Sequence, residues 1–183
     1  FPKLDESPYD AFGTGHSSTS LSALLGMALA AHQRGIQRQH IAVIGDASIA
    51  SGMAFEALNH LGTTQADVLI VLNDNTMGID PSVGALKQFF EQATTQNPLG
   101  HNLFESLHIA YTGPVDGHSL EAVIEALAVA KQTKGPQLLH IRTTKGKGLQ
   151  AAETKQITYH APGKFDPLTG KLITSPPSGK TNY

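Results

Sequence analysis

Two polar clusters carry the residue types from which a metal site can be built. Residues 45–48 read Gly-Asp-Ala-Ser and residues 73–75 read Asn-Asp-Asn, and each follows an apolar run, at 40–44 and 67–72, that is typical of a buried β-strand. A helix-like segment of crossover length separates the runs, which predicts a βαβ unit with parallel strands. Because ligands of such sheets bind beyond the carboxyl ends of the strands, we expect both clusters to share one crevice.

Within these clusters, Asp46 offers a carboxylate and Asn75 an amide oxygen. With backbone carbonyls they form an oxygen-only ligand set, which magnesium prefers and completes with phosphates and water. The structural alternative is that Asp and Asn cap helices and accept unusual backbone angles where strands turn into helices. The coincidence of both clusters at matching strand ends favours the metal site.

A third candidate site is residues 13–18, Gly-Thr-Gly-His-Ser-Ser, directly before a predicted helix over 21–34. Free N–H groups and the dipole at a helix N-terminus favour an anion such as a diphosphate. A dinucleotide-binding motif is not favoured, because no strand precedes the glycines and Ser18 takes the place of the third glycine. His16 alone is as compatible with a packed or surface histidine as with a ligand.

Three later features have both a chemical and a structural interpretation. Residues 145–148, Lys-Gly-Lys-Gly, follow the last predicted strand and fit either phosphate contact or an ordinary solvated loop. His118 beside Asp116 could form an acid–base pair, but two glycines and the ready N-cap Ser119 favour a structural turn over 113–118. His160 lies in a stretch too polar and irregular for core, so we expect an active-site role rather than a histidine that pins the tail to the domain.

The alternation of strands and helices predicts an α/β fold: a doubly wound, mainly parallel sheet with helices on both faces. Helix 21–34 is rich in small residues and is expected to be mostly buried, while polar residues 93–101 predict a mobile loop. The predicted order is helix 21–34, strand 40–44, helix 53–62, strand 67–72, short helix 83–92, turn 113–118, helix 120–133 and strand 138–144.

Composition narrows the class of protein. A chain of 183 residues with 40% hydrophobic content is long enough for one α/β core. A net charge of −2 with scattered basic residues predicts no nucleic-acid partner and no anionic membrane partner. No apolar run reaches the roughly 18 residues of a membrane span, and no secretory signal is visible. The absence of cysteine excludes disulfides and favours a reducing compartment, with bacterial cytoplasm as the default.

Several segments, taken in order, resemble a known family. The two polar clusters are similar to the thiamine-diphosphate motif, which begins Gly-Asp-Gly and ends in paired asparagines; here Ala47 stands in place of the second glycine. The whole set resembles the amino-terminal domain of the 1-deoxy-D-xylulose-5-phosphate synthase family. Its members here are residues 15–20 (Gly-His-Ser-Ser-Thr-Ser), 45–46 (Gly-Asp), 52–60 (Gly-Met-Ala-Phe-Glu-Ala-Leu-Asn-His), 72–75 (Leu-Asn-Asp-Asn), 113–118 (Gly-Pro-Val-Asp-Gly-His), 145–148 (Lys-Gly-Lys-Gly) and 160–165 (His-Ala-Pro-Gly-Lys-Phe).

The resemblance implies an enzyme of the transketolase-like superfamily, with thiamine diphosphate and Mg²⁺ as cofactors. Such an enzyme condenses pyruvate with D-glyceraldehyde 3-phosphate, releases carbon dioxide, and feeds isoprenoid, thiamine and pyridoxal synthesis. The implied metal ligands are Asp46, Asn75 and the main-chain carbonyl of Met77. The implied cofactor contacts are Gly15, His16, Ser17, Ala47, Ser48 and Asn75, and the implied catalytic residues are His16 and His160.

The resemblance also sets expectations for the whole enzyme. Residues 1–174 would form the diphosphate- and magnesium-binding domain and residues 175–183 the start of an interdomain linker, without the pyrimidine-binding and carboxy-terminal domains. The chain alone is therefore expected to be inactive, and the complete enzyme to be a cytoplasmic homodimer. The segment between Leu86 and Leu103 is shorter than in the family, and Leu149 stands where a tyrosine is common. Alternatives are a transketolase half-subunit, an E1-type decarboxylase component or a non-catalytic cofactor-binding module.

Overall fold

The computed structural model of the chain describes residues 2–93 and 102–173. It divides into two compact units, residues 1–143 and residues 144–183, which are considered separately. The loop predicted over 93–101 falls almost entirely, and the linker predicted over 175–183 entirely, outside the described residues. No helix in the described part of the chain combines the length and apolar character needed to cross a membrane.

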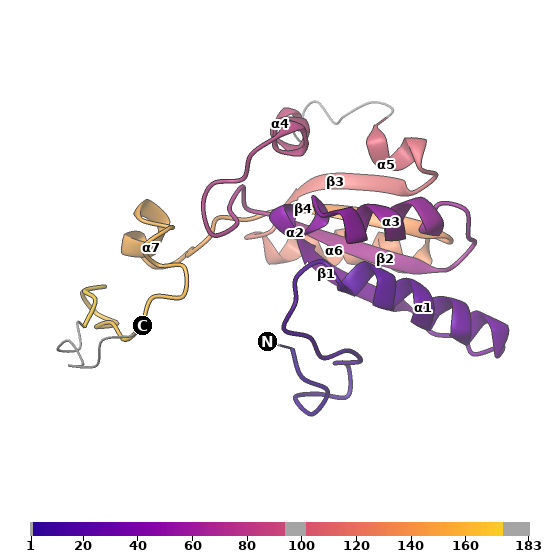
Figure 1. The fold of residues 1–183 in the computed structure, drawn as a ribbon. Coiled ribbons are helices and arrows are strands. Elements are labelled where there is room, and N and C mark those ends of the chain that lie inside the picture. The colour runs from indigo at the N-terminus through magenta and orange to yellow at the C-terminus, as the bar shows by residue number, and fades with distance from the viewer. Residues whose placement is uncertain (1, 94–101, 174–183) are drawn as a thin grey trace, which may run out of the picture. The chain divides into compact units, whose positions relative to one another are not determined.

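The first unit is built on a four-stranded parallel sheet of order β1-β2-β4-β3 (Figure 1). The strands are β1 (His40–Gly45), β2 (Val68–Asp74), β3 (Ala110–Asp116) and β4 (Pro136–Arg142). The helices are α1 (Ser20–Gln33), α2 (Asp46–Ile49), α3 (Gly52–Leu61), α4 (Ala85–Gln92), α5 (Leu103–Ser106) and α6 (Leu120–Gln132). The predicted α/β fold with a parallel sheet is confirmed.

Helices cover both faces of this sheet, as the alternating pattern predicts. On one face, Ile70 and Leu72 of β2 pack with buried residues of α1 and α3. On the other face, Leu69 of β2 and Leu139 of β4 pack against one side of α6. The central strands β2 and β4 are thus apolar on both sides, which explains why they appear in the sequence as continuous apolar runs rather than alternating ones.

Two sequence-based expectations are wrong. Helix α1 is not mostly buried: four side chains, Leu21, Leu24, Leu25 and Ala28, are buried and the rest of the helix faces outward or is half-buried. Its small residues therefore permit close packing on one side only.

The predicted turn over 113–118 is the second error, because Gly113, Pro114 and the two residues after them belong to β3. Only Gly117 and His118 turn, and Ser119 then caps α6 as expected, accepting a hydrogen bond from the Ala122 N–H. Proline and glycine are tolerated here because β3 is an edge strand whose register with β4 shifts between Thr112 and Val115.

Over residues 144–173, the part of the second unit that the structure describes, there is one short helix, α7 (Gln150–Thr154). After it, Phe165 and Leu172 form an antiparallel bridge, and the Tyr159 ring packs edge-on against Phe165 with ring centroids 5.9 Å apart. The Tyr159 hydroxyl also donates a hydrogen bond to the Gly170 carbonyl. These contacts organise the described part of the unit around Tyr159.

Candidate functional site

The two predicted polar clusters lie at neighbouring strand ends. Gly45, the last residue of β1, is the register partner of Asn73 near the end of β2. Asp46 follows at once as the first residue of α2, and Asn75 directly follows Asp74, the last residue of β2. Both clusters therefore sit at the carboxyl edge of the sheet, where doubly wound folds bind their ligands.

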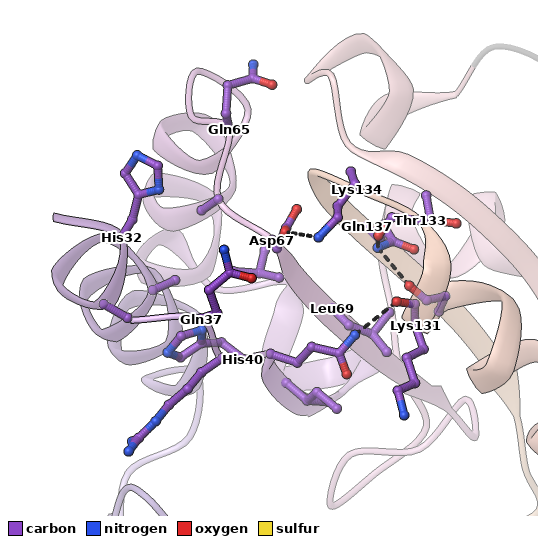
Figure 2. Close-up of a pocket in the computed structure, with 18 of the residues that line it drawn as sticks. His32, Gln37, His40, Gln65, Asp67, Leu69, Lys131, Thr133, Lys134 and Gln137 are labelled. Carbon is purple, nitrogen blue, oxygen red and sulfur yellow. Dashed lines mark hydrogen bonds and ion pairs between the residues drawn. The ribbon is translucent and has the colours of Figure 1, made fainter. Parts of the chain in front are cut away.

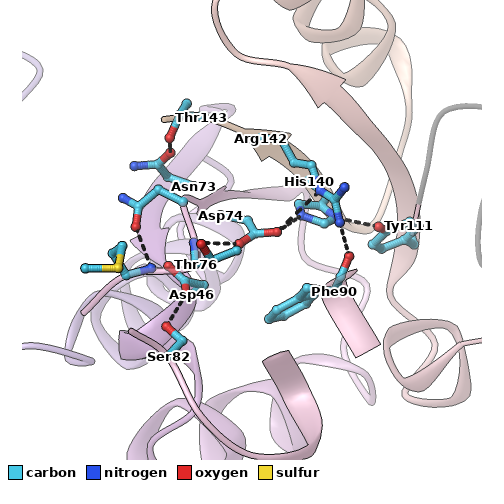
Figure 3. Close-up of polar contacts among 12 residues, drawn as sticks. Asp46, Asn73, Asp74, Thr76, Ser82, Phe90, Tyr111, His140, Arg142 and Thr143 are labelled. Atoms are coloured by element: carbon cyan, nitrogen blue, oxygen red, sulfur yellow. Dashed lines mark hydrogen bonds and ion pairs between the residues drawn. The ribbon is translucent and has the colours of Figure 1, made fainter. Parts of the chain in front are cut away.

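Asp46 is buried, with 6% of its surface exposed, although it begins a helix. Its Oδ2 accepts a hydrogen bond of 2.6 Å from the Ser82 hydroxyl (Figure 3), which ties α2 to the loop before α4. Its Oδ1 accepts no hydrogen bond from any residue in the described ranges 2–93 and 102–173. The carboxylate is thus oriented by one oxygen and keeps the other available.

The chain after β2 makes two consecutive side-chain turns. The Oδ1 of Asp74 accepts from the Thr76 N–H at 3.1 Å, and the Oδ1 of Asn75 accepts from the Met77 N–H at 2.9 Å. Thr76 sits in the left-handed region at φ 59°, a conformation that costs a non-glycine residue about 1 kcal/mol or more and persists only where contacts impose it. These turns fix the path of the segment in which the Asn75 side chain and the Met77 carbonyl were predicted to be metal ligands.

The predicted diphosphate segment is joined to the same region. The Ser18 hydroxyl donates to the Ser48 carbonyl at 2.8 Å, so residues 13–18 lie against α2. Within the segment, Gly15, His16 and Ser17 are exposed, and a Cβ added to Gly15 would have no neighbour within 4 Å. The structure therefore brings the Gly15–Ser17 neighbourhood to Ser48, with open space beside it.

A cavity of about 250 Å³ adjoins this region. It is bordered by Asp46 and Ala47 on one side and by Gly78, Ser82 and Phe90 on the other. A Cβ built on Gly78 would come within 3.2 Å of the Ala47 Cβ, so a small residue at 47 is needed for the loop to approach α2 so closely. Alanine satisfies this requirement in place of the glycine expected there.

A buried polar network beside the site was not identified from the sequence (Figure 3). His140 is fully buried; its Nε2 lies 3.0 Å from Asp74 Oδ2 and its Nδ1 lies 2.6 Å from the Tyr111 hydroxyl. Arg142 adds its Nε 3.6 Å from the same Asp74 oxygen and donates to the Phe90 carbonyl. The available signal was one polar residue, His140, inside the apolar strand sequence Leu-Leu-His-Ile.

Burial and polar contacts shift the pKa values of Asp74 and Tyr111 in this network. Burial by itself raises the pKa of Asp74, but the hydrogen bond and charge of His140, the Thr76 N–H and Arg142 together hold it below the ordinary value of 3.8. Burial raises the pKa of Tyr111 to about 12. At neutral pH, Asp74 is therefore a carboxylate and Tyr111 keeps its proton.

The other residues singled out from the sequence make contacts of their own. The Asp116 carboxylate accepts from the His118 backbone N–H at 2.9 Å, which supports the structural interpretation of that pair. In the second unit, His160 is exposed and its Nδ1 lies 2.7 Å from the Lys145 ammonium nitrogen. Lys147 lies 3.9 Å from Glu153, and Leu149 is the N-cap residue of α7.

A larger cavity, of about 710 Å³, lies at the opposite, amino end of the strands (Figure 2). His40, Asp67 and Gln137 line it together with residues from the ends of α1 and α6. Both oxygens of Asp67 accept a hydrogen bond there, one from Gly135 N at 2.8 Å and the other from Lys134 Nζ at 2.9 Å. Because ligands of this fold bind at the carboxyl edge, we assign the candidate site to that edge, where Asp46 and Ala47 border the smaller cavity.

The chemistry available at the carboxyl edge is oxygen ligation. Within residues 2–93 and 102–173, no group of three or more His, Cys, Asp or Glu side chains is arranged to hold a metal ion. The predicted set is of another kind, because it has one carboxylate, one amide oxygen and one backbone carbonyl. Such a set leaves most of a magnesium shell to phosphate and water oxygens.

Comparison with known proteins gives a consistent result. The chain is 49% identical to a 1-deoxy-D-xylulose-5-phosphate synthase of Cytophaga hutchinsonii over 210 aligned positions, which cover 94% of the chain and 33% of the relative. Synthases of Polaromonas sp. and Bordetella pertussis are 46% and 44% identical over 99% of the chain and 34% and 35% of their own lengths. The chain thus spans about a third of the length of the curated relatives it matches.

A solved structure shares the fold. An enzyme from Mycobacterium smegmatis, assigned as thiamin diphosphate-dependent, aligns with 71% of this chain and 23% of its own, at a TM-score of 0.52 and 21% identity. The sequence model of a family described as 1-deoxy-D-xylulose-5-phosphate synthase matches residues 1–101 and 95–143. The two matches overlap within the stretch predicted to be short, and the alignment of 210 positions exceeds the 183 residues of the chain. On this match, the chain belongs to the 1-deoxy-D-xylulose-5-phosphate synthase family.

Proposed function

We propose that this chain is the diphosphate- and magnesium-binding part of a transferase that condenses pyruvate with D-glyceraldehyde 3-phosphate. The products are 1-deoxy-D-xylulose 5-phosphate and carbon dioxide, so three carbons and three carbons give five and one. Membership of the family and the names of its relatives support this activity. The alternatives, a transketolase half-subunit or an E1-type component, lack that support.

The observation that carries the proposal is the paired ends of β1 and β2. Asp46 and Asn75 follow strands in register at Gly45 and Asn73, and Asp46 keeps one carboxylate oxygen without a partner among the described residues. Mg²⁺ would be held by Asp46, the Asn75 amide oxygen and the Met77 carbonyl. The Asn75 oxygen already accepts the Met77 N–H, and its second lone pair remains for the ion.

The diphosphate of thiamine diphosphate would lie between the 13–18 segment and α2. Gly15, His16 and Ser17 are exposed beside open space, and no side chain caps the first turn of α1. The N–H groups of that turn suit an anion, with Ala47 and Ser48 on the opposite side and Asn75 touching both metal and cofactor. The proposed diphosphate site therefore depends on small residues and backbone N–H donors rather than on cationic side chains.

Thiamine diphosphate supplies, when bound, the chemistry by which pyruvate loses carbon dioxide and its other carbons join an aldehyde. The protein's task here is to anchor the cofactor and to hold protons at the reacting end. We assign His16 to the cofactor side and His160, oriented by Lys145, to proton transfer or hydrogen bonding at a substrate oxygen. The remaining parts of the enzyme and a homodimeric assembly belong to the same proposal. A cytoplasmic location belongs to it too, and the cysteine-free composition favours that location.

The 183-residue chain on its own is expected to bind the cofactor but to make no product, because it corresponds to about a third of its relatives. Incubation of the purified chain with both substrates, cofactor and Mg²⁺ should release no carbon dioxide above the blank. Release at the rate of a complete relative would refute this expectation.

The experiment that tests the site is a charge-removal pair. Asp46→Asn keeps the shape of the side chain and an acceptor for Ser82 but removes the charge offered to Mg²⁺, so thiamine diphosphate affinity in Mg²⁺ should fall by ~10²-fold, a few kcal/mol of charged ligation. Glu125→Gln, at an exposed position of α6, removes the same charge elsewhere and should leave affinity unchanged. Equal affinities of the two variants would refute the assignment of Asp46.

A further inference from the structure

The loop that carries the candidate ligands is attached to β4 at both of its ends. Residues 75–90 run from the end of β2, past Met77 and Ser82, into α4. We call this stretch the ligand segment. Between its ends it contributes Ser82, whose hydroxyl orients Asp46. Whatever fixes the ends of the ligand segment therefore also fixes the candidate site.

The first attachment runs through Asp74 and His140. Asp74, with 2% of its surface exposed, uses Oδ1 to accept from Thr76 N and Oδ2 to contact His140 Nε2, while its carbonyl accepts from Thr143 N at 2.9 Å. One tautomer satisfies every contact of the ring: Nε2–H donates to Asp74, and Nδ1 accepts from the Tyr111 hydroxyl. The carboxylate is thereby held between the strand and the first turn of the ligand segment.

The second attachment runs through Arg142 and Phe90. The Arg142 guanidinium donates to the Phe90 carbonyl in the last turn of α4, and the Phe90 ring packs on His140 with centroids 5.3 Å apart. His140 and Arg142 are two residues apart on β4 and so point to the same face of the sheet. That face is the one on which Asp74 lies, because Asp74 is the register partner of Arg142.

A network that only stabilised the core would not need this layout. A fully buried histidine with both ring nitrogens engaged requires two correctly placed partners, because a buried polar group left without one is destabilising. An apolar side chain would fill the same space at less risk, as Leu138 and Leu139 do in the same strand. The polar residues His140 and Arg142 instead stand where β4 contacts both ends of the ligand segment.

We propose that His140 and Arg142 are positioning residues, which hold the two ends of the ligand segment from β4 so that Asn75, Met77 and Ser82 are arranged before metal and diphosphate bind. For its consequence on affinity this proposal rests on the function proposed above. The arrangement of the segment itself can be measured without any ligand. His140 and Arg142 touch neither the cofactor nor the substrate in this account.

The test compares two amide replacements of one residue. In His140→Gln the amide nitrogen occupies nearly the position of Nε2 and can still donate to Asp74. In His140→Asn the amide lies near Nδ1 and reaches only toward Tyr111. Both variants lose the ring packing on Phe90, so the comparison between them turns on which ring contact the amide can replace. The first readout is hydrogen exchange of the Thr76 and Ser82 amides without ligand, and the second is calorimetric affinity for thiamine diphosphate in Mg²⁺.

Loss of one buried hydrogen bond corresponds to roughly ten-fold in an equilibrium, so the Thr76 amide should exchange roughly ten-fold faster in His140→Asn than in His140→Gln. Cofactor affinity should be lower in His140→Asn by a similar factor. Equal exchange in the two variants would overturn the proposal, as would unequal exchange with equal affinity. If the unsubstituted chain binds no cofactor, the proposed function fails, and the exchange comparison still decides whether β4 fixes the segment.

Arg142→Met tests the second attachment, because methionine keeps much of the side-chain stem and removes the donor to Phe90. The Ala93 amide, which donates to the Phe90 carbonyl at 3.2 Å, should exchange faster while the Thr76 amide changes less. Identical exchange of Ala93 in the variant and the unsubstituted chain would show that Arg142 does not hold this end.

Discussion

The two ends of the sheet each have an aspartate, and the two aspartates differ in how many of their oxygens accept hydrogen bonds. At the amino end, both oxygens of Asp67 are engaged, by the Gly135 N–H and by the Lys134 ammonium, so this residue ties the start of β2 to the turn before β4. At the carboxyl end, Asp46 has one oxygen held by Ser82 and the other available. An acid whose oxygens are all used supports the fold, whereas one that is oriented but unsaturated is suited to bind a cation.

Asp67 should make stability depend on pH in a defined direction. The Gly135 N–H and the Lys134 side chain hold the pKa of Asp67 below its ordinary value of 3.8. A lowered folded-state pKa gives stability that is complete above the ordinary value and is lost as the pH falls through the folded value. Urea unfolding should therefore find Asp67→Asn less stable than the unsubstituted chain at pH 7, by roughly 0.5–1 kcal/mol for this partly exposed pair.

At pH 3 the same comparison should give a smaller difference, because the carboxyl group is then largely protonated in the unfolded chain and must give up that proton to form its folded-state contacts. A difference that is the same at pH 7 and pH 3 would show that the Asp67 charge does not contribute.

The chemical role proposed for His160 depends on how its ring is oriented. Its Nδ1 lies 2.7 Å from Lys145 Nζ, so the ammonium donates to it and leaves Nε2 as the nitrogen that can serve a substrate. In the complete polypeptide that contains this chain, His160→Ala should lower turnover by ~10²-fold, the scale of a positioned acid–base group. Unfolding temperature and diphosphate affinity should change little. Normal turnover with a large drop in unfolding temperature would instead assign His160 to anchoring the tail.

Among the elements, β3 departs most from what its residues suggest. Its Gly113 has φ 118° and lies against β4, where an added Cβ would come within 2.4 Å of the His140 carbonyl oxygen. Glycine here is required by close approach of two strands and not by a turn. The irregular pairing between Thr112 and Val115 follows from the same contact, since the chain must bend to pass the backbone of β4.

Substitution of this glycine should distinguish a steric clash from backbone strain alone. Gly113→Ala combines an unfavourable φ with a backbone clash and should cost roughly 2–4 kcal/mol of unfolding free energy. Gly135→Ala has a similar positive φ, 83°, but no atom within 4 Å, and should cost about 1 kcal/mol. Denaturant unfolding of both variants provides the measurement. Equal losses would mean that β4 relaxes around residue 113.

The sequence predicted most elements because strong local signals and tertiary context agree in them. The apolar runs in β1, β2 and β4 and the Ser119 cap of α6 appear within one or two residues of their expected bounds. β3 was missed because its glycine and proline suggest a turn. The glycine is in fact needed for close contact with β4, and a local sequence pattern carries no information about that contact. Helix α1 was expected to be mostly buried because its small residues permit close packing under a sheet, but only one side of the helix packs in this way.

The site was predictable only in part, for a similar reason. Asp46 and Asn75 are signalled by polar residues directly after apolar runs, and strand register then brings those ends together. The pairing of His140 with Asp74 joins residues 66 positions apart and depends on β4 lying next to β2, an order that the sequence pattern does not specify. The hydroxyl of Ser82 reaches Asp46 across 36 positions, a contact that depends on the path of the loop after β2 rather than on a local pattern.

For the molecule as a whole, two facts define its role. The chain spans about a third of its relatives, and its polar groups of the expected kind gather at one edge of one sheet. The role proposed for the first unit is to anchor a diphosphate and a metal ion, while other parts of a complete enzyme would supply the pyrimidine site and much of the proton chemistry. Cofactor binding by this chain would then depend on Mg²⁺ at the carboxyl edge of the sheet.

The most direct measurement is a calorimetric titration of the purified 183-residue chain with thiamine diphosphate, in Mg²⁺ and, separately, in EDTA. Because the metal would bridge Asp46, Asn75 and the diphosphate, saturable binding should be seen with Mg²⁺ at cofactor concentrations up to ~1 mM and should disappear in EDTA. Thiamine without its diphosphate should not bind under either condition, since the site proposed here contacts the diphosphate. Binding that is equally strong in EDTA, or absent in both conditions, would contradict the account.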